Sequence, residues 1–431
     1  GVGLTGPVTF LVLGFVNGLT SGFSVKVAQA FGAGDEARVR RAVGMSYLLC
    51  VAVAVVVTAV AVPLTAPLLR LMQTPSAYYD YAYWYLLIIF CGIGATVFYN
   101  IVAGLLRAVG DSRTPLYFLV AAAVLNVGLD FAFIMGCGWH YCGAALATVL
   151  SQLISGAACL AYALYRYPVL RPARSDFGWD TRLAMGHFAV GLPMALQFSI
   201  TAIGCIVQQT ALNGLDAALP GAVTAYTAAS KIDNIANQVF VALGTALATY
   251  AGQNYGAGEF GRIRRGVLAG MVYVFAGSVI GFAFAVGLCE PLMKLFLNTD
   301  LSADVAGNYG AIIGYGRQFL LWQCSFYPFL GAIYVYRNTL QGIGRSAVTT
   351  FAGVTELAGR VLASLVFVRV WGFTGVCSSN PVAWVAAVIF LVATYAVVMR
   401  RRNNGELPRA RSRAHRRRLR RSCRIAVRRA S

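Results

Sequence analysis

The sequence predicts an all-α integral membrane protein that crosses the bilayer many times. Of its 431 residues, 58% are hydrophobic and only 12% are charged, and the mean hydropathy is +0.68, values far from those of ordinary soluble domains. Apolar runs of about 20 or more residues, long enough to span a bilayer, recur from end to end with short polar loops between them. Because little chain is left for a soluble domain, we expect the functional residues to lie in the spans.

Eleven spans follow from the apolar runs, whose ends are marked by Gly, Pro and charged residues. The predicted spans are residues 1–31, 43–70, 79–106, 114–136, 142–165, 187–213, 220–251, 266–290, 305–336, 347–369 and 374–399. They predict alternating loops on the two sides of the membrane.

Arginines gather in every second predicted loop. These loops hold Arg38, Arg40, Arg41, Arg107, Arg113, Arg166, Arg171, Arg174, Arg182, Arg262, Arg264, Arg265, Arg337 and Arg345. The opposite loops hold only Arg70, Lys294 and Arg369. Because basic loops stay on the cytoplasmic side, we expect a multi-pass protein of the cell membrane whose C-terminus is cytoplasmic.

An internal repeat divides the chain. Residues 27–43, VAQAFGAGDEARVRRAV, match residues 251–267, AGQNYGAGEFGRIRRGV, with eight identities in seventeen positions. Six spans separate the copies, which predicts two parallel lobes: an N-terminal lobe at 1–165, a cytoplasmic linker at 166–186 and a C-terminal lobe at 187–399. Two spans precede the second copy and one precedes the first, so we expect a further N-terminal span and twelve spans, six per lobe, in the full protein.

The C-terminal segment 400–431 carries most of the net charge of +20. It holds 14 Arg against one acid, Glu406, which predicts a disordered cytoplasmic tail. Attraction to anionic lipids is the expected role of such a tail. No aromatic residues alternate with the arginines for base stacking, so no nucleic-acid partner is expected.

The stretch LNVGLDFAFI places two polar residues in an apolar span. Asn126 and Asp130 are four residues apart, so on a helix they share one face, and Thr148 follows on the next span. A carboxylate at the centre of a bilayer costs roughly 2.5 to 3.5 kcal/mol, and a bound proton or cation removes that cost. Asp130 lies about 24 Å along a span that enters from the cytoplasm, so this site should be fed from outside. The alternative is a structural role for Asp130, either hydrogen-bonded to a neighbouring helix or paired with Lys26.

Other polar residues inside predicted spans have two open interpretations. Glu356 and Arg360 are four residues apart and are expected to pair, either as a structural pair or as part of a cavity or gate. Lys231 and Asp233 suggest a polar cavity wall in the span 220–251.

Several motifs in order along residues 1–400 resemble the multidrug and toxic compound extrusion (MATE) family. They are the paired GAGD and GAGE motifs, LRAVGDSRTP, LNVGLDFAFI, GAALATVLSQ, AYTAASKID, AGQNYGAG and ELAGR. The resemblance implies a two-lobed, twelve-helix secondary transporter that exports amphipathic and often cationic drugs or metabolites in exchange for protons or sodium. It implies a monomer in the lipid bilayer with small-molecule substrates and no cofactor besides the coupling ion.

The resemblance is closer to the DinF-like and archaeal branch, in which a cation site lies in the N-terminal lobe. That site's Asn, Asp and Thr match Asn126, Asp130 and Thr148, with Na⁺ at Asp130 as the one expected metal. The family's additional Asp belongs to the first span, which we expect to be missing here. In the other branch an acid occupies the position where this chain has Gln197, so a second-lobe sodium site of that kind is not expected.

Three other functions fit the sequence less well. Related flippases move lipid-linked precursors, but they look different in the GAG motifs and in the Asn126 and Asp130 pattern. A membrane enzyme has little support because His140, His187 and His415 are dispersed and no metal spacing or nucleophile elbow is present. A scaffold would leave Asp130 without a role.

Overall fold

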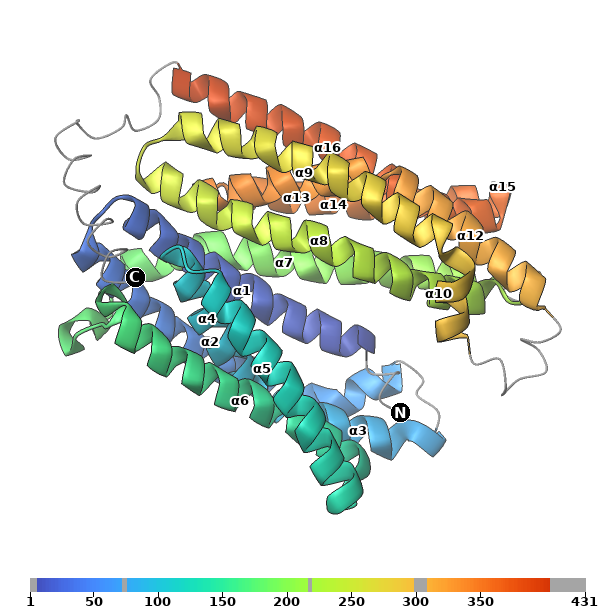
Figure 1. Ribbon diagram of the computed structural model, residues 1–431, viewed down its shortest axis with the longest axis horizontal. Coiled ribbons are helices and arrows are strands. Elements are labelled where there is room, and N and C mark those ends of the chain that lie inside the picture. The colour runs from blue at the N-terminus through green and yellow to red at the C-terminus, as the bar shows by residue number, and fades with distance from the viewer. Residues whose placement is uncertain (1–5, 72–75, 216–218, 298–307, 404–431) are drawn as a thin grey trace. The chain divides into compact units, whose positions relative to one another are not determined.

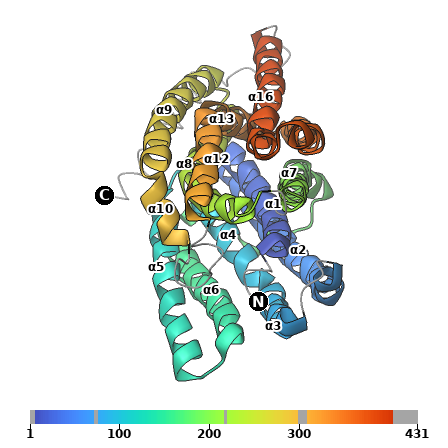
Figure 2. The same cartoon turned by 90° about the vertical axis from the view of Figure 1, so that its right-hand side faces the viewer.

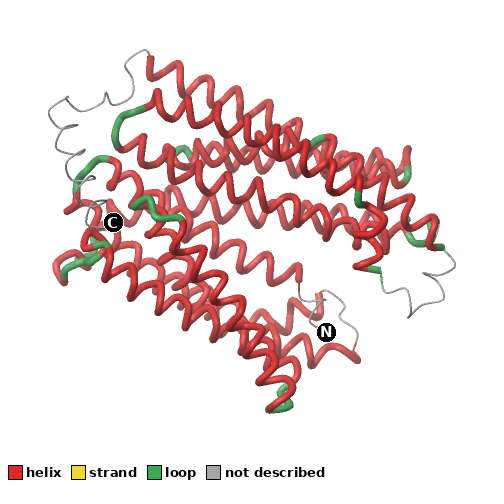
Figure 3. Tube along the Cα trace, in the orientation of Figure 1, coloured by secondary structure: helices red, strands yellow, loops and turns green. Residues whose placement is uncertain are grey.

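The computed structural model describes residues 6–71, 76–215, 219–297 and 308–403 (Figure 1). Every regular element in these residues is helical (Figure 3). The chain packs into two compact units. One unit contains the described residues up to Ser199 together with Gly252–Glu259, and the other contains Ile200–Ala251 and the described residues from Phe260 onward.

The first unit contains the helices on both sides of the first copy of the repeat. They are α1 Gly6–Gly32, α2 Glu36–Leu71, α3 Ser76–Cys91, α4 Ile93–Ala108, α5 Arg113–Asp130, the π-helical η2 Phe131–Gly136, α6 His140–Arg166, and the short 3₁₀ turns η3 Pro168–Leu170 and η4 Arg174–Phe177. The next helix, α7 Thr181–Asn213, begins in this unit and ends in the other. The predicted lobes at 1–165 and 187–399 therefore stay a prediction.

The second unit repeats this order of helices. It contains α8 Ala222–Gly256 up to Ala251, α9 Phe260–Gly287, α10 Cys289–Phe296, α12 Tyr309–Ser325, α13 Tyr327–Ile343, α14 Ser346–Leu362, the π-helical η5 Ala363–Phe367, α15 Val368–Trp371 and α16 Phe373–Asn403. Both α5 and α14 thus run into a π-helical segment before the chain turns. Such segments are rare and occur frequently at functional sites.

The described helices agree with the predicted number of spans. Nine helices are long and apolar enough to cross a membrane, and two pairs qualify together although each is bent, α3 with α4 by 47° and α12 with α13 by 45°. Counting each bent pair as one span gives eleven. Large apolar side chains also face outward, including Val55 at 64% and Val124 at 69% exposure, as a surface in contact with lipid requires.

The two copies of the repeat fold alike. Each copy ends one helix and starts the next through a glycine with positive φ, Gly34 at 69° and Gly258 at 71°, a conformation that other residues adopt only at a cost. The glycine N–H donates to Phe31 O at 2.9 Å in the first copy and to Tyr255 O at 3.0 Å in the second. The sequence repeat is therefore a repeat of structure.

The weaker similarity between LRAVGDS and LQGIGRS is also structural. Gly110 and Gly344 end α4 and α13 with φ values of 99° and 90°. In each case the next N–H bonds back to the preceding turn, from Asp111 to Leu106 O at 3.0 Å and from Arg345 to Leu340 O at 2.9 Å. This is the hydrogen bond of a Schellman motif.

Arg337, which the sequence places in a loop, is buried inside a helix. Arg337 was expected in a cytoplasmic loop after the span 305–336, but α13 continues to Ile343 and Arg337 is only 5% exposed. The apolar run is interrupted by one arginine that is neutralised by a partner from another helix, so local hydropathy ended the span too early. The predicted basic tail lies, from residue 404 onward, outside the described residues.

Asp111 stabilises the turn between α4 and α5 by hydrogen bonds. Its Oδ1 accepts hydrogen bonds from the N–H groups of Arg113 at 3.1 Å and Thr114 at 3.0 Å, and its Oδ2 accepts from the Tyr167 hydroxyl at 2.9 Å. Partial burial raises the pKa of this carboxyl, but the hydrogen bonds from Thr114, Tyr167 and Arg113 together hold it below its usual value. Asp111 therefore stabilises the start of α5 in its ionised form.

We expect Asp111→Ala to lower the free energy of unfolding by about 1 kcal/mol, the usual loss for a helix cap. Because the folded pKa is depressed, the contribution is complete above the unfolded pKa of about 3.9 and is lost as the pH falls through the lower folded value. Melting temperatures of purified protein between pH 3 and pH 7 test this. Ser112→Ala, which removes no cap hydrogen bond, is the control, and a difference from wild type that persists unchanged at pH 3 would contradict the prediction.

Candidate functional site

Asn126 and Thr148 meet between two neighbouring helices. The helices α5 and α6 are joined by a short turn and run side by side in both views (Figures 1 and 2). Asn126 Nδ2 lies 3.5 Å from Thr148 Oγ1, to which it donates, and Thr148 Oγ1 donates to Ala144 O at 3.0 Å. Two of the three residues predicted for the cation site are therefore in contact.

Asp130 is the last residue of α5, where the π-helical segment begins. Its side chain is half-buried, and its Oδ1 is buried with no hydrogen-bond partner. Tyr85 on α3 is close enough to interact electrostatically with it, whereas no ion pair joins Asp130 to Lys26 or to another basic residue in the described part of the chain. A buried carboxylate oxygen without a partner is a place for a proton or a cation.

The donor set around Asp130 favours a proton or a small hard cation. A carboxylate, an amide and a hydroxyl supply oxygen ligands, which hard cations prefer. The described residues contain no group of three His, Cys, Asp or Glu side chains placed to hold a metal ion. The arrangement is therefore unlike a transition-metal centre.

A second polar cluster surrounds Glu356 in the other unit. The predicted pair is present, with Arg360 Nη2 3.8 Å from Glu356 Oε2. Arg337 from α13 pairs with the other carboxylate oxygen of Glu356 through its Nη2. All three side chains are only 6 to 7% exposed.

Neutral side chains extend this cluster. Arg360 Nε donates to Asn380 Oδ1 at 3.0 Å, Asn380 Nδ2 donates to Gln323 Oε1 at 3.3 Å, and Gln323 Nε2 donates to Cys377 O at 3.0 Å. Our sequence interpretation missed Arg337, Asn380 and Gln323. The available signal was an arginine within LGAIYVYRNTL, whose apolar character continues on both sides.

The remaining predicted residues lie apart from these two clusters. Asp233 is 8% exposed on α8 and accepts a hydrogen bond from the Tyr327 hydroxyl at 2.9 Å. Lys231, two residues away, is exposed and lies over the Phe296 ring at 5.4 Å. Lys231 and Asp233 therefore point in different directions, and Gln197 is half-buried on α7.

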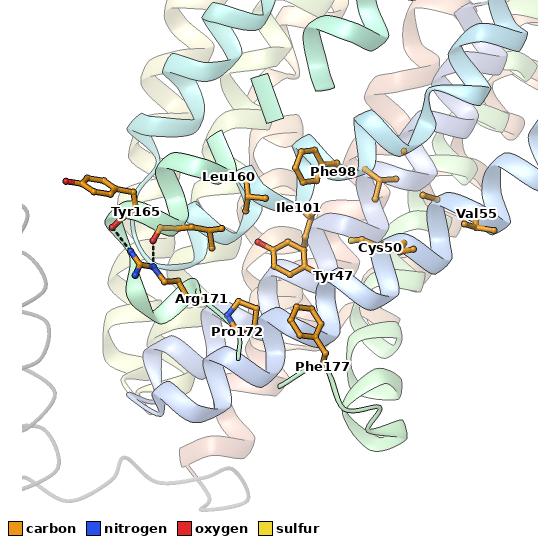
Figure 4. Close-up of a pocket in the computed structure, with 15 residues that line it drawn as sticks. Tyr47, Cys50, Val55, Phe98, Ile101, Leu160, Tyr165, Arg171, Pro172 and Phe177 are labelled. Carbon is orange, nitrogen blue, oxygen red and sulfur yellow. Dashed lines mark hydrogen bonds between the residues drawn. The ribbon is translucent and has the colours of Figure 1, made fainter. Parts of the chain in front are cut away.

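An apolar pocket of about 890 Å³ lies among α2, α4, α6 and the segment that follows α6 (Figure 4). Tyr47, Cys50, Phe98 and Leu160 line it, and Arg171 lies at one side, where its guanidinium donates to the carbonyls of Leu164 and Tyr165. None of the lining residues belongs to either polar cluster. An apolar lining of this kind favours the binding of hydrocarbon groups.

The fold and these clusters define a class of protein: a multi-pass helical membrane protein with two similar repeats and buried polar sites inside helix pairs. The MatE family model matches residues 1–132 and 193–363. The chain therefore belongs to the MatE family, and it is a membrane transporter of small molecules, not an enzyme.

Curated relatives agree with this family. The chain is 25% identical over 411 residues to the probable multidrug resistance protein YoeA of Bacillus subtilis, covering 92% of this chain and 85% of the relative. It is 29% identical to the probable multidrug resistance protein YpnP of the same organism, covering 80% and 73%. A FAD transporter of Shewanella oneidensis is 23% identical, with coverage of 80% and 74%. The multidrug relatives support the class of efflux transporter.

Solved structures share the fold. A MOP superfamily transporter from Pyrococcus furiosus superposes with a TM-score of 0.83 at 23% identity, covering 93% of this chain and 87% of that chain. A MATE protein crystallised in complex with MaL6 superposes with a TM-score of 0.82 at 22% identity, covering 93% and 88%. The predicted all-α, MATE-type membrane fold is confirmed.

Proposed function

We propose that this transporter exports amphipathic organic compounds, cations among them, in exchange for protons or sodium ions that bind at Asp130. The observation that carries the proposal is the buried Oδ1 of Asp130, which has no hydrogen-bond partner although Asn126 and Thr148 on the same helix pair bond to each other. The names of the multidrug relatives support the substrate class.

The position of Asp130 gives exchange a physical basis. Asp130 lies where α5 passes into the π-helical η2, and π segments mark helices whose backbone ladder is locally rearranged. Neutralising the carboxylate changes the free energy of keeping it in an apolar surrounding, so occupancy biases the packing of α5 against α6. An ion that favours one packing and a substrate that favours the other are thereby coupled.

The proposed orientation follows from the charge distribution. The basic loops support a cytoplasmic C-terminus in a cell-membrane protein, and with this orientation the ion reaches Asp130 from outside. A proton entering across 100 mV supplies about 2.3 kcal/mol, enough for a modest uphill step. The protein acts as a monomer and needs no cofactor beyond the coupling ion, and its basic tail contacts anionic lipids.

Transport by the purified protein in proteoliposomes tests the proposal. With substrate movement followed by ethidium fluorescence, an imposed inward pH or sodium gradient should drive ethidium outward against its own gradient. The gradient that works identifies the coupling ion. Ethidium movement that is unaffected by either gradient, from protein that is correctly inserted, would refute coupled exchange.

A further inference from the structure

The two units contain the same local arrangement, here called the frame: a helix that runs into a π-helical segment, and a glycine near the start of the next long helix that packs against this segment. In the first, the α5–η2 helix is followed by Gly143 at the start of α6, where a Cβ would lie 2.9 Å from Phe133 Cβ. In the second, the α14–η5 helix is followed by Gly375 at the start of α16, where a Cβ would collide with the backbone of Phe367. Each glycine thus lets the next helix approach the π-helical segment closely.

Each unit contains an equivalent pair of bonded side chains. Asn126 bonds to Thr148 in the first unit, and Arg360 bonds to Asn380 in the second. Each of these pairs joins the helix before the π segment to the helix after it. The position of the predicted cation site in the first unit is therefore occupied in the second unit by an arginine.

The charge of the frame is reversed in the second unit. The first frame has the acid Asp130 beside neutral partners. The second has two guanidinium groups, of Arg337 and Arg360, around the single carboxylate of Glu356. Asp233, the other buried acid among the described residues of this unit, accepts a hydrogen bond from Tyr327 and is not within ion-pair distance of either arginine. The cluster therefore carries one uncompensated positive charge.

Some hydrogen-bond donors of this cluster also have no acceptor. Arg337 Nε and Arg360 Nη1 are buried and have no hydrogen-bond partner, and neither does Ser364 Oγ on the adjoining π segment. Both arginine residues are more than nine-tenths buried, at 5% and 6% exposure. A buried charge without a counter-ion and buried N–H groups without acceptors are both costly, and one anion satisfies both.

We propose that the Arg337–Glu356–Arg360 cluster binds a small oxyanion, a carboxylate or a phosphate, in the second unit. Guanidinium groups match the oxygen geometry of these anions and stay charged at any physiological pH. The anion has two sources: a free inorganic anion, or the anionic group of a transported compound. The second source rests on the proposed function, because it makes the exported compounds amphiphiles with a negative group, alone or beside a positive one.

Binding measurements on the full chain in nanodiscs of zwitterionic lipid test the site. The buffer anion is chloride, which is not an oxyanion, and the probes are inorganic phosphate, followed by calorimetry, and carboxyfluorescein, followed by anisotropy. Saturable binding of phosphate identifies a free anion. Binding of carboxyfluorescein without binding of phosphate identifies a group on a transported compound.

The variant Arg360→Gln should weaken binding of the recognised probe at least tenfold, whereas Arg345→Gln, which removes an exposed arginine from the same unit, should leave it unchanged. Arg360→Gln retains the pair between Glu356 and Arg337, so we expect it to fold, and its melting temperature is recorded. Arg337→Gln is the second test and should weaken binding as well.

Two results would overturn the site: neither probe binds the wild-type protein saturably, or folded Arg360→Gln binds as the wild type does. These outcomes are independent of transport, because binding needs no gradient. If the protein exports ethidium in proteoliposomes yet binds neither probe, the proposed anion site is refuted and the proposed transport function stands.

Discussion

Gradient-driven export of ethidium should fall at least tenfold when Asp130 is replaced by asparagine. The asparagine side chain has nearly the same size as a protonated carboxyl group but can neither take up a proton nor offer a charge to sodium. The exchange of occupied and empty states that couples the ion to the substrate is therefore lost. Ethidium efflux in proteoliposomes, with and without the gradient, measures the effect.

The same experiment needs a variant that removes an acid elsewhere in the same unit. Asp80→Asn suits this purpose because Asp80 is exposed near the start of α3, and it should transport as the wild type does. Ethidium binding to Asp130→Asn, measured without a gradient, should be retained. Full gradient-driven export by a correctly inserted Asp130→Asn protein would exclude Asp130 as the coupling residue.

The variant Glu356→Gln should be the most destabilising single change in the second unit. It removes the one carboxylate between Arg337 and Arg360 and leaves two buried guanidinium groups facing each other. Breaking a buried ion pair by removing one partner costs about 3 to 5 kcal/mol. Thermal unfolding of the purified protein in detergent should show a large fall in melting temperature.

A matched pair on the surface provides the control. Glu290 and Lys294 are also four residues apart on one helix and lie 3.0 Å apart, but their side chains are more than half exposed. Glu290→Gln should leave the melting temperature unchanged within error, because exposed pairs are screened by water. If Glu356→Gln and Glu290→Gln had the same melting temperature, the buried cluster would not stabilise the fold.

The membrane fold was open to prediction because its signals are local. A span must be long and apolar, and these properties are present in each stretch of sequence without reference to the rest of the chain. The same holds for the repeat, since GAG turns require glycine at the position with positive φ, as Gly34 and Gly258 show. The eleven predicted spans accordingly agree with the described helices and their two bent pairs.

The candidate site in the first unit was predictable for a related reason. Asn126 and Asp130 share a helix face by their spacing, and a short turn brings Thr148 alongside, so the contact between Asn126 and Thr148 depends only on adjacent elements. Its role in ion binding stays a prediction. The missing hydrogen-bond partner of Asp130 Oδ1 appears only when all neighbouring helices are in place.

The cluster in the second unit was only partly predictable, although Arg337 and Glu356 lie on the consecutive helices α13 and α14. Glu356 has a partner on its own helix, Arg360, and this pair was visible in the spacing. Its partner Arg337 comes from α13, and hydropathy had placed that residue in a loop. An arginine can remain inside a span only when another helix supplies its counter-charge, and no local pattern records that.

By itself, the sequence determined the class of protein, the number of described spans, the repeat and the face that carries Asn126 and Asp130. Only the tertiary structure decided which buried charges meet: the two arginines around Glu356, the Asp233 carboxylate on the Tyr327 hydroxyl and the carboxylate oxygen of Asp130 without a partner. The physical reason is that hydropathy and helical spacing are properties of a single helix. Charge compensation in a membrane, in contrast, also depends on contacts between different helices.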